Sequence, residues 1–117
     1  MTKARITVFH DEQKLGDVLY DGPFKEETGR IVYHDKTGGY NEVNIQTQNT
    51  IRIRRATEGF KSEIILSKEE SVAHIKTAEG AFDIPINLLQ LDCSEERVFA
   101  CYDTGEKIAI QIDLVKE

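Results

Sequence analysis

The residues best suited to hold an anion form a short run of cations: Arg52, Arg54, Arg55 and Lys61. Guanidinium groups bind carboxylate or phosphate oxygens through two parallel hydrogen bonds, so a pair of arginines can clamp an anion. In an extended strand Arg52 and Arg54 point to one side, whereas Ile51 and Ile53 point to the other. Because the isoleucines belong in a core, we expect Arg52 and Arg54 to face water and to pair with Glu63 on the next segment. An anion pocket is the alternative, if that side faces the interior.

The other reactive side chains are two cysteines and three histidines: Cys93, Cys101, His10, His34 and His74. The histidines fall on different segments, and neither an H-x-H nor a C-x-x-C pattern occurs, so the spacing predicts no metal site. Cys101 and His74 would suit a thiol enzyme if the fold brought them together, because a cysteine nucleophile needs a neighbouring base. A small buried hydrophobe is the more ordinary role for Cys101. We therefore expect no catalytic residue, metal or cofactor, and keep the thiol enzyme as an alternative.

A disulfide between Cys93 and Cys101 conflicts with strand geometry. If residues 94–96 form a hairpin turn, the two cysteines lie about 13 Å apart along the ladder. A disulfide needs Cα atoms within about 7 Å of each other. We expect two free, buried thiols, which suits a reducing compartment.

The elements that must position these side chains are short β-strands. Segments rich in β-branched and aromatic residues recur about every 8–12 residues between turn residues, which is typical of an all-β sandwich or barrel. The expected strand segments are 5–9, 14–20, 29–34, 40–47, 50–55, 60–67, 72–77, 81–86, 88–93, 97–102 and 107–115. Residues 87–96 carry an alternative, a short helix with Asn87 as its N-cap.

Turn chemistry separates these segments. Asp21-Gly22-Pro23, Gln48-Asn49 and the Gly38-Gly39 pair are predicted turns. Pro85 marks an edge strand or a bulge, because proline cannot donate to a ladder. Loops this short join neighbouring strands as antiparallel pairs. We expect residues 1–117 to form one domain, an up-and-down meander that closes into a barrel of eight to ten strands; a β-sandwich is the alternative.

The overall charge and hydropathy exclude two classes of function. The net charge is −6, with 21 acidic residues against 15 basic ones, which disfavours general nucleic-acid binding. No apolar run of about 18 residues could span a membrane, and the N-terminal residues lack the pattern of a secretory signal. We expect a cytoplasmic protein that binds neither nucleic acid nor membrane.

Several segments from residue 40 onward are similar to a known family. They are Tyr40-Asn41-Glu42-Val43, Thr50-Ile51-Arg52-Ile53, Ser62-Glu63-Ile64-Ile65-Leu66, Thr77-Ala78-Glu79-Gly80-Ala81-Phe82-Asp83-Ile84-Pro85-Ile86, the strand ending at Tyr102 and the isoleucine-rich terminal strand. In this order they resemble the YwiB-like family of small bacterial proteins, a domain of unknown function. The resemblance implies a calycin-like (lipocalin-like) β-barrel and brings no established activity.

The functional prediction follows from that topology. A barrel of about eight strands is either filled by side chains or holds one small ligand, and the bulky inward residues here favour a filled interior. We expect a non-enzymatic binder of a small apolar or amphipathic ligand, in the barrel or at its mouth. The candidate ligand-binding residues are Tyr33, Tyr40, Arg52, Arg54, His74 and Tyr102. The alternative is a protein-interaction module, for a second copy or another protein, that uses an exposed strand edge or the Arg52/Arg54 face.

Overall fold

Every regular element is a β-strand in the computed structural model, which describes residues 2–11, 15–45 and 49–116. The strands are β1 (Thr2–His10), β2 (Asp17–Phe24), β3 (Arg30–His34), β4 (Tyr40–Asn44), β5 (Thr50–Thr57), β6 (Phe60–Ser67), β7 (Val72–Thr77), β8 (Gly80–Pro85), β9 (Asn87–Cys93), β10 (Arg97–Asp103) and β11 (Lys107–Lys116). The all-β prediction is confirmed: each of the eleven expected segments overlaps a strand, although the expected barrel had only eight to ten. Within the described residues, no helix is long and apolar enough to cross a membrane.

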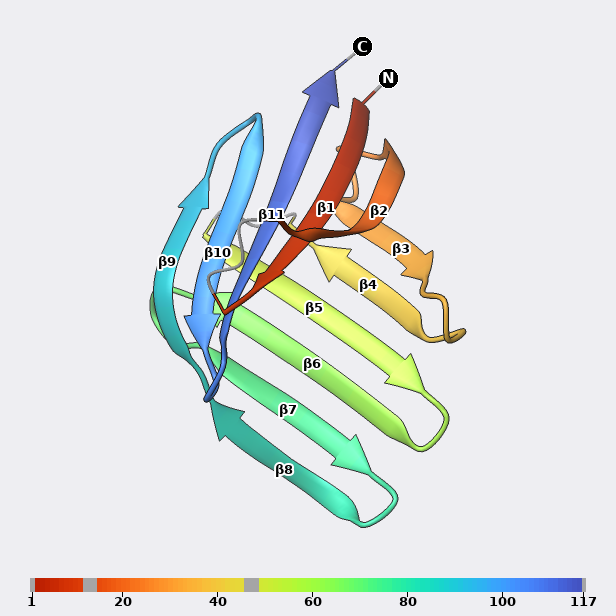
Figure 1. Ribbon diagram of the computed structural model, residues 1–117, viewed down its shortest axis with the longest axis vertical. Coiled ribbons are helices and arrows are strands. Elements are labelled where there is room, and N and C mark those ends of the chain that lie inside the picture. The colour runs from red at the N-terminus through yellow and green to blue at the C-terminus, as the bar shows by residue number, and fades with distance from the viewer. Residues whose placement is uncertain (1, 12–14, 46–48, 117) are drawn as a thin grey trace.

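The strands form two antiparallel sheets, and the strands of one sheet run obliquely to those of the other (Figure 1). The five-stranded sheet has the order β2-β1-β11-β10-β9, and the six-stranded sheet has the order β3-β4-β5-β6-β7-β8. Neighbours in sequence pair as hairpins, because short connections leave no room for a crossover. The pairing of β1 with β11 brings the two ends of the chain side by side.

Alternation along the strands decides which side chains face the interior. In β11, Ile110 and Ile112 are buried, and their neighbours on the same face, Ile108 and Leu114, pack against the core. In β5, Ile51 is completely buried and Arg52 is exposed. The period of two in the sequence therefore predicted the inward face of both strands correctly.

Closure into a barrel is not observed. Among the described residues, the two sheets share only one isolated bridge near β2 and β3, Lys25↔Arg30, and β8 and β9 share no ladder. Pro85 ends β8, an edge strand as predicted, and has no N–H to extend the pairing. The chain then bends at Ile86, which is buried and donates its N–H to the Ser71 carbonyl at 3.2 Å. The arrangement is two facing sheets, which a sandwich or an open fold describes as well as a barrel.

Four local predictions can be compared with the structure. The predicted turn Asp21-Gly22-Pro23 lies inside β2, an edge strand where the missing proline N–H breaks no inner ladder. Residues 87–93 form strand β9, so the expected strand is confirmed and the alternative helix is not formed. Cys93 and Cys101 are free thiols as expected, but Cys93 is exposed because it lies near the end of edge strand β9. Gln48 of the predicted Gln48-Asn49 turn, and the C-terminal end of the predicted strand 40–47, lie outside the described residues.

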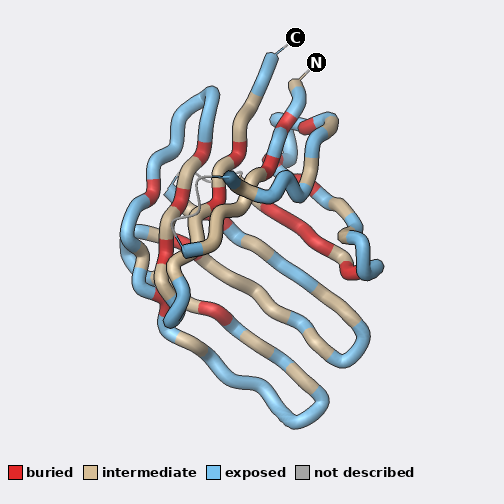
Figure 2. Tube along the Cα trace, in the orientation of Figure 1, coloured by how far each residue is buried: buried red, intermediate tan, exposed pale blue. Residues whose placement is uncertain are grey.

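The molecule is elongated, with principal extents of 46 × 30 × 28 Å. The hairpins β5–β6 and β7–β8 extend beyond the five-stranded sheet (Figure 1), and their far ends are largely exposed (Figure 2). The largest fully buried side chains are Ile6, Ile31, Val43, Ile51, Leu66 and Ile112. The core is therefore packed in the part where the two sheets overlap.

Candidate functional site

A cavity of about 780 Å³ lies between the two sheets, and it is partly open to solvent. Its apolar lining comes from both sheets and includes Val8, Tyr33, Val43, Ile53, Ile64, Tyr102, Ile108 and Ile110. The prediction of a filled interior is thus wrong at this end. The reason is that the hairpins of the six-stranded sheet extend beyond the five-stranded sheet, which therefore covers only part of their inner face (Figure 1).

The polar edge of this cavity is an ion pair between Asp35 and Arg55. Arg55 donates from Nε and Nη2 to Asp35 Oδ2, at 3.3 and 3.0 Å. Asn41, which is buried, donates from Nδ2 to the same oxygen at 3.1 Å and to the Gly39 carbonyl at 3.1 Å. Arg55 and Asn41 are register partners on β5 and β4, so the sheet itself places them side by side.

The β3–β4 turn holds the Asp35 carboxylate in place. Asp35 Oδ1 accepts hydrogen bonds from the Thr37 N–H at 3.0 Å, the Thr37 hydroxyl at 2.6 Å and the Gly39 N–H at 2.9 Å. These bonds, with those from Asn41 and Arg55, lower the pKa of Asp35 far below its ordinary value. A Cβ atom at position 39 would lie 2.8 Å from Asp35 Oδ2. The turn therefore requires glycine there, and Asp35 is a fixed anion.

Two tyrosines and a serine present hydroxyl groups at the cavity wall. Tyr102 is 5% exposed, and burial raises the pKa of Tyr102 and of Tyr33. Both phenols are therefore neutral at physiological pH and able to donate a hydrogen bond. Neither these two hydroxyls nor that of Ser62 forms a hydrogen bond within the described part of the chain, although all three residues line the cavity.

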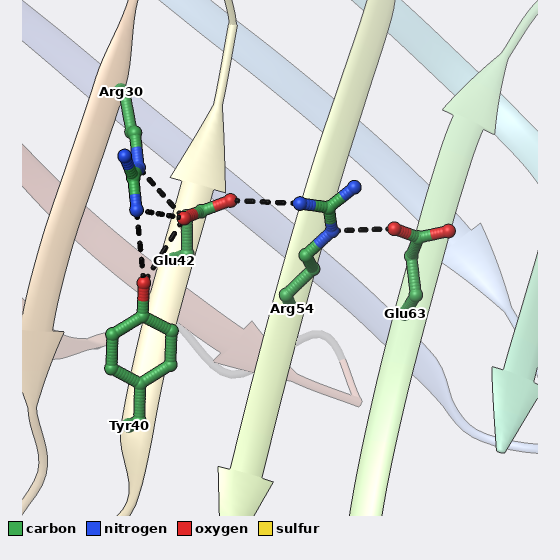
Figure 3. Close-up of polar contacts among 5 residues, drawn as sticks. All are labelled: Arg30, Tyr40, Glu42, Arg54 and Glu63. Atoms are coloured by element: carbon green, nitrogen blue, oxygen red, sulfur yellow. Dashed lines mark hydrogen bonds and ion pairs between the residues drawn. The ribbon is translucent and has the colours of Figure 1, made fainter. Parts of the chain in front are cut away.

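The outer face of the six-stranded sheet carries a separate ladder of charged side chains (Figure 3). The Glu42 side chain is only 9% exposed and lies between Arg30, at 2.6 Å, and Arg54, at 3.2 Å. Tyr40 donates its hydroxyl to Glu42 at 3.0 Å, and Arg54 also pairs with Glu63. The predicted Arg54–Glu63 pair is confirmed, as is the outward direction of Arg54.

Farther along this outer face, His74 bonds to Asp83 at 2.7 Å, and that bond raises the pKa of His74. Lys61 and Lys76 are register partners on β6 and β7 and are both exposed. Neither lysine forms an ion pair within the described residues. A hollow of about 410 Å³ lies over this region.

The structure divides the six predicted ligand-binding residues into two sets. Tyr33 and Tyr102 line the cavity between the sheets. The other four, Tyr40, Arg52, Arg54 and His74, belong to the outer face of the six-stranded sheet. The six therefore do not form one site.

The pairing of Cys101 with His74 is not formed either. Cys101 alternates with the buried Ala100 and Tyr102, so it faces away from the interior on the five-stranded sheet. His74 faces away from the interior on the other sheet. In addition, no group of three or more histidine, cysteine or acidic residues is close enough to hold a metal ion within the described residues.

Sequence reasoning missed Asp35, Asn41, Arg55 and Ser62 as cavity residues. The signal for Arg55 was present, because alternation from Ile51 and Ile53 places it on the inward face of β5. The same alternation places Asn41 beside Val43 and Ser62 beside Ile64. Asp35 carried only a turn signal, and its contact with Arg55 spans 20 residues.

One solved structure resembles this chain throughout its length. The crystal structure of the ywiB protein from Bacillus subtilis matches 99% of this chain and 91% of its own, with a TM-score of 0.62 and 14% sequence identity. Identity this low shows a common fold alone. The structural match supports the expected YwiB-like fold. No protein-family model matches the chain, and no curated protein matches it significantly.

Proposed function

We propose that this protein binds a small apolar or amphipathic molecule in the cavity between its two sheets. The observation that carries the proposal is a partly open chamber of about 780 Å³ whose wall combines apolar side chains from both sheets with polar ones. Ligand pockets in proteins commonly measure about 300–1,000 Å³ and combine an apolar lining with a small number of placed polar groups. The same site would lie at the mouth of a calycin-like barrel, so the proposal does not depend on how the fold is classified.

A neutral fluorescent probe, N-phenyl-1-naphthylamine, tests this proposal. Its emission rises when it enters an apolar site, and we expect saturable binding to the folded protein. Ser62→Trp places an indole in the cavity and should abolish the rise. Lys61→Trp puts the same indole on the outer face of the same strand and should leave binding intact. Absence of saturable binding by the unmodified protein, or equal binding by both variants, would contradict the proposal.

A second candidate function is the docking of an acidic protein partner on the outer face of the six-stranded sheet. The cations on this face outnumber the carboxylates although the whole chain carries a net charge of −6. The cations are Arg30, Arg52, Arg54, Lys61 and Lys76, and the carboxylates are Glu42, Glu63 and Asp83. Like charges placed directly opposite each other destabilise a sheet, so Lys61 and Lys76 incur a cost that an acidic partner would offset.

A labelled polyglutamate peptide is the probe for this second function. We expect its fluorescence anisotropy to rise on binding and the affinity to fall as salt is added. The double variant Lys61→Glu/Lys76→Glu should lose binding. The variant Lys68→Glu/Lys116→Glu has the same net charge but leaves the outer-face cations unchanged, because Lys116 lies on β11 of the other sheet and Lys68 follows the end of β6, so it should retain most of the affinity. Equal losses in both variants would indicate a net-charge effect and refute this candidate.

A further inference from the structure

The polar edge of the cavity carries no uncompensated charge at its centre. Arg55 is the only cation whose guanidinium joins the Asp35–Asn41 cluster within the described residues, and two of its nitrogens already donate to Asp35. An anionic ligand that approached Arg55 would meet the Asp35 carboxylate at the same place. Of the other rim residues that can carry charge, Asp17 and Lys36 have opposite signs and are exposed, His10 pairs with Glu106 at 3.1 Å, and His34 is exposed.

Asp35 cannot move aside easily to release Arg55. Its other oxygen accepts three hydrogen bonds from Thr37 and Gly39, and Asn41 binds the oxygen that faces Arg55. A ligand carboxylate would have to break this set of bonds or lie beside a fixed negative charge. Both options cost free energy that an uncharged ligand does not lose.

Tyr102 contributes an unpaired hydroxyl among the described residues that line the cavity. The residue is 95% buried, yet no fully buried side-chain polar atom of the described chain lacks a partner. Among residues 2–11, 15–45 and 49–116, the Tyr102 hydroxyl has no hydrogen-bond partner, so it is not fully enclosed, and Tyr102 lines the cavity. Tyr33 and Ser62 contribute further hydroxyls to the same wall. A ligand oxygen that accepts a hydrogen bond would satisfy these groups, whereas a pure hydrocarbon would leave them unpaired.

We infer that the cavity selects an uncharged amphipathic molecule, whose apolar part lies among the aliphatic side chains and whose ester or amide carbonyl accepts a hydrogen bond from Tyr102. This inference rests on the proposed function of ligand binding. It adds the chemical class of the ligand, a neutral acyl derivative as opposed to a free fatty acid.

Competition against N-phenyl-1-naphthylamine tests the class with two ligands of equal chain length. N-methyldecanamide is neutral, and decanoate is an anion at neutral pH. We expect the amide to displace the probe at a concentration at least roughly tenfold lower than decanoate does, since 1.4 kcal/mol corresponds to a factor of ten. Tyr102→Phe should weaken the amide by roughly fivefold, the effect of one hydrogen bond, and leave decanoate unchanged.

Asp35→Asn supplies a gain-of-function control, because the amide side chain keeps an acceptor for the turn and frees the charge of Arg55. Decanoate should then gain affinity relative to the amide, by roughly tenfold. If decanoate competes as well as the amide in the unmodified protein, or if neither competes although the probe binds, the inference on ligand class is overturned and ligand binding stands. If the probe itself does not bind, both ideas fail.

Discussion

The difference between the packed and the hollow part of the interior can be measured with two substitutions on one strand. Leu66 and Ile64 lie on the same face of β6, two residues apart. Leu66 is completely buried in the core, whereas Ile64 packs against the core and also lines the cavity. Replacing each by alanine removes a similar amount of apolar side chain from two different surroundings.

The expected costs follow from what each side chain leaves behind. Leu66→Ala loses about 2 kcal/mol of transfer free energy and opens a closed void, for a total of about 3–4 kcal/mol. Ile64 is only partly buried and its loss only enlarges a space that is already open, so we expect the reduced transfer free energy alone, about 1–1.5 kcal/mol. The two variants should therefore differ by about 2 kcal/mol in their free energy of unfolding.

Urea unfolding followed by circular dichroism measures this difference. With a slope of about 2 kcal/mol per molar urea, the two midpoints should lie about 1 M apart. If Leu66→Ala fails to fold, the pair Leu66→Val and Ile64→Val should show the same order on a smaller scale. Equal costs at the two positions would mean that the sheets close over Ile64 in solution, and the argument for a ligand chamber would lose its basis.

Three further outcomes are expected. Asp35→Asn should lower the melting temperature at pH 7. The difference in melting temperature between this variant and the unmodified protein should shrink as the pH falls below about 4, because a carboxylate with a lowered pKa stabilises the fold only while it is ionised. The NMR titration of His74 should give a pKa above its ordinary value of 6.5, and Asp83→Asn should reverse this shift. The stabilisation that the His74–Asp83 pair contributes is present below about pH 6.5 and is lost as the pH rises through the raised pKa. A thiol reagent should modify Cys93 before Cys101 in the folded protein, since Cys93 is exposed and Cys101 is half-buried. Cys93→Ser should therefore remove the fast phase of the labelling reaction. A fast phase that persists in this variant would contradict the difference in burial.

The amino-acid sequence by itself determined the class of fold and the facing of its side chains. The alternation of Ile51 and Ile53 with Arg52 and Arg54 predicts both the strand and the outward direction of the arginines, because side chains in a strand alternate with a period of two. Turn residues such as Gly38 and Gly39 predict the hairpin between β3 and β4 in the same way. These are local properties, and a sequence records them directly.

The tertiary structure alone decided how the two sheets meet and what lies between them. Whether the meander closes depends on the relation of β2 to β3 and of β8 to β9, and no local pattern specifies it. The Asp35–Arg55 pair joins residues 20 positions apart, and Tyr102 lines the cavity from the opposite sheet. A binding chamber arises from the offset between two packed surfaces, so its volume and its polar edge exist only once the chain has folded.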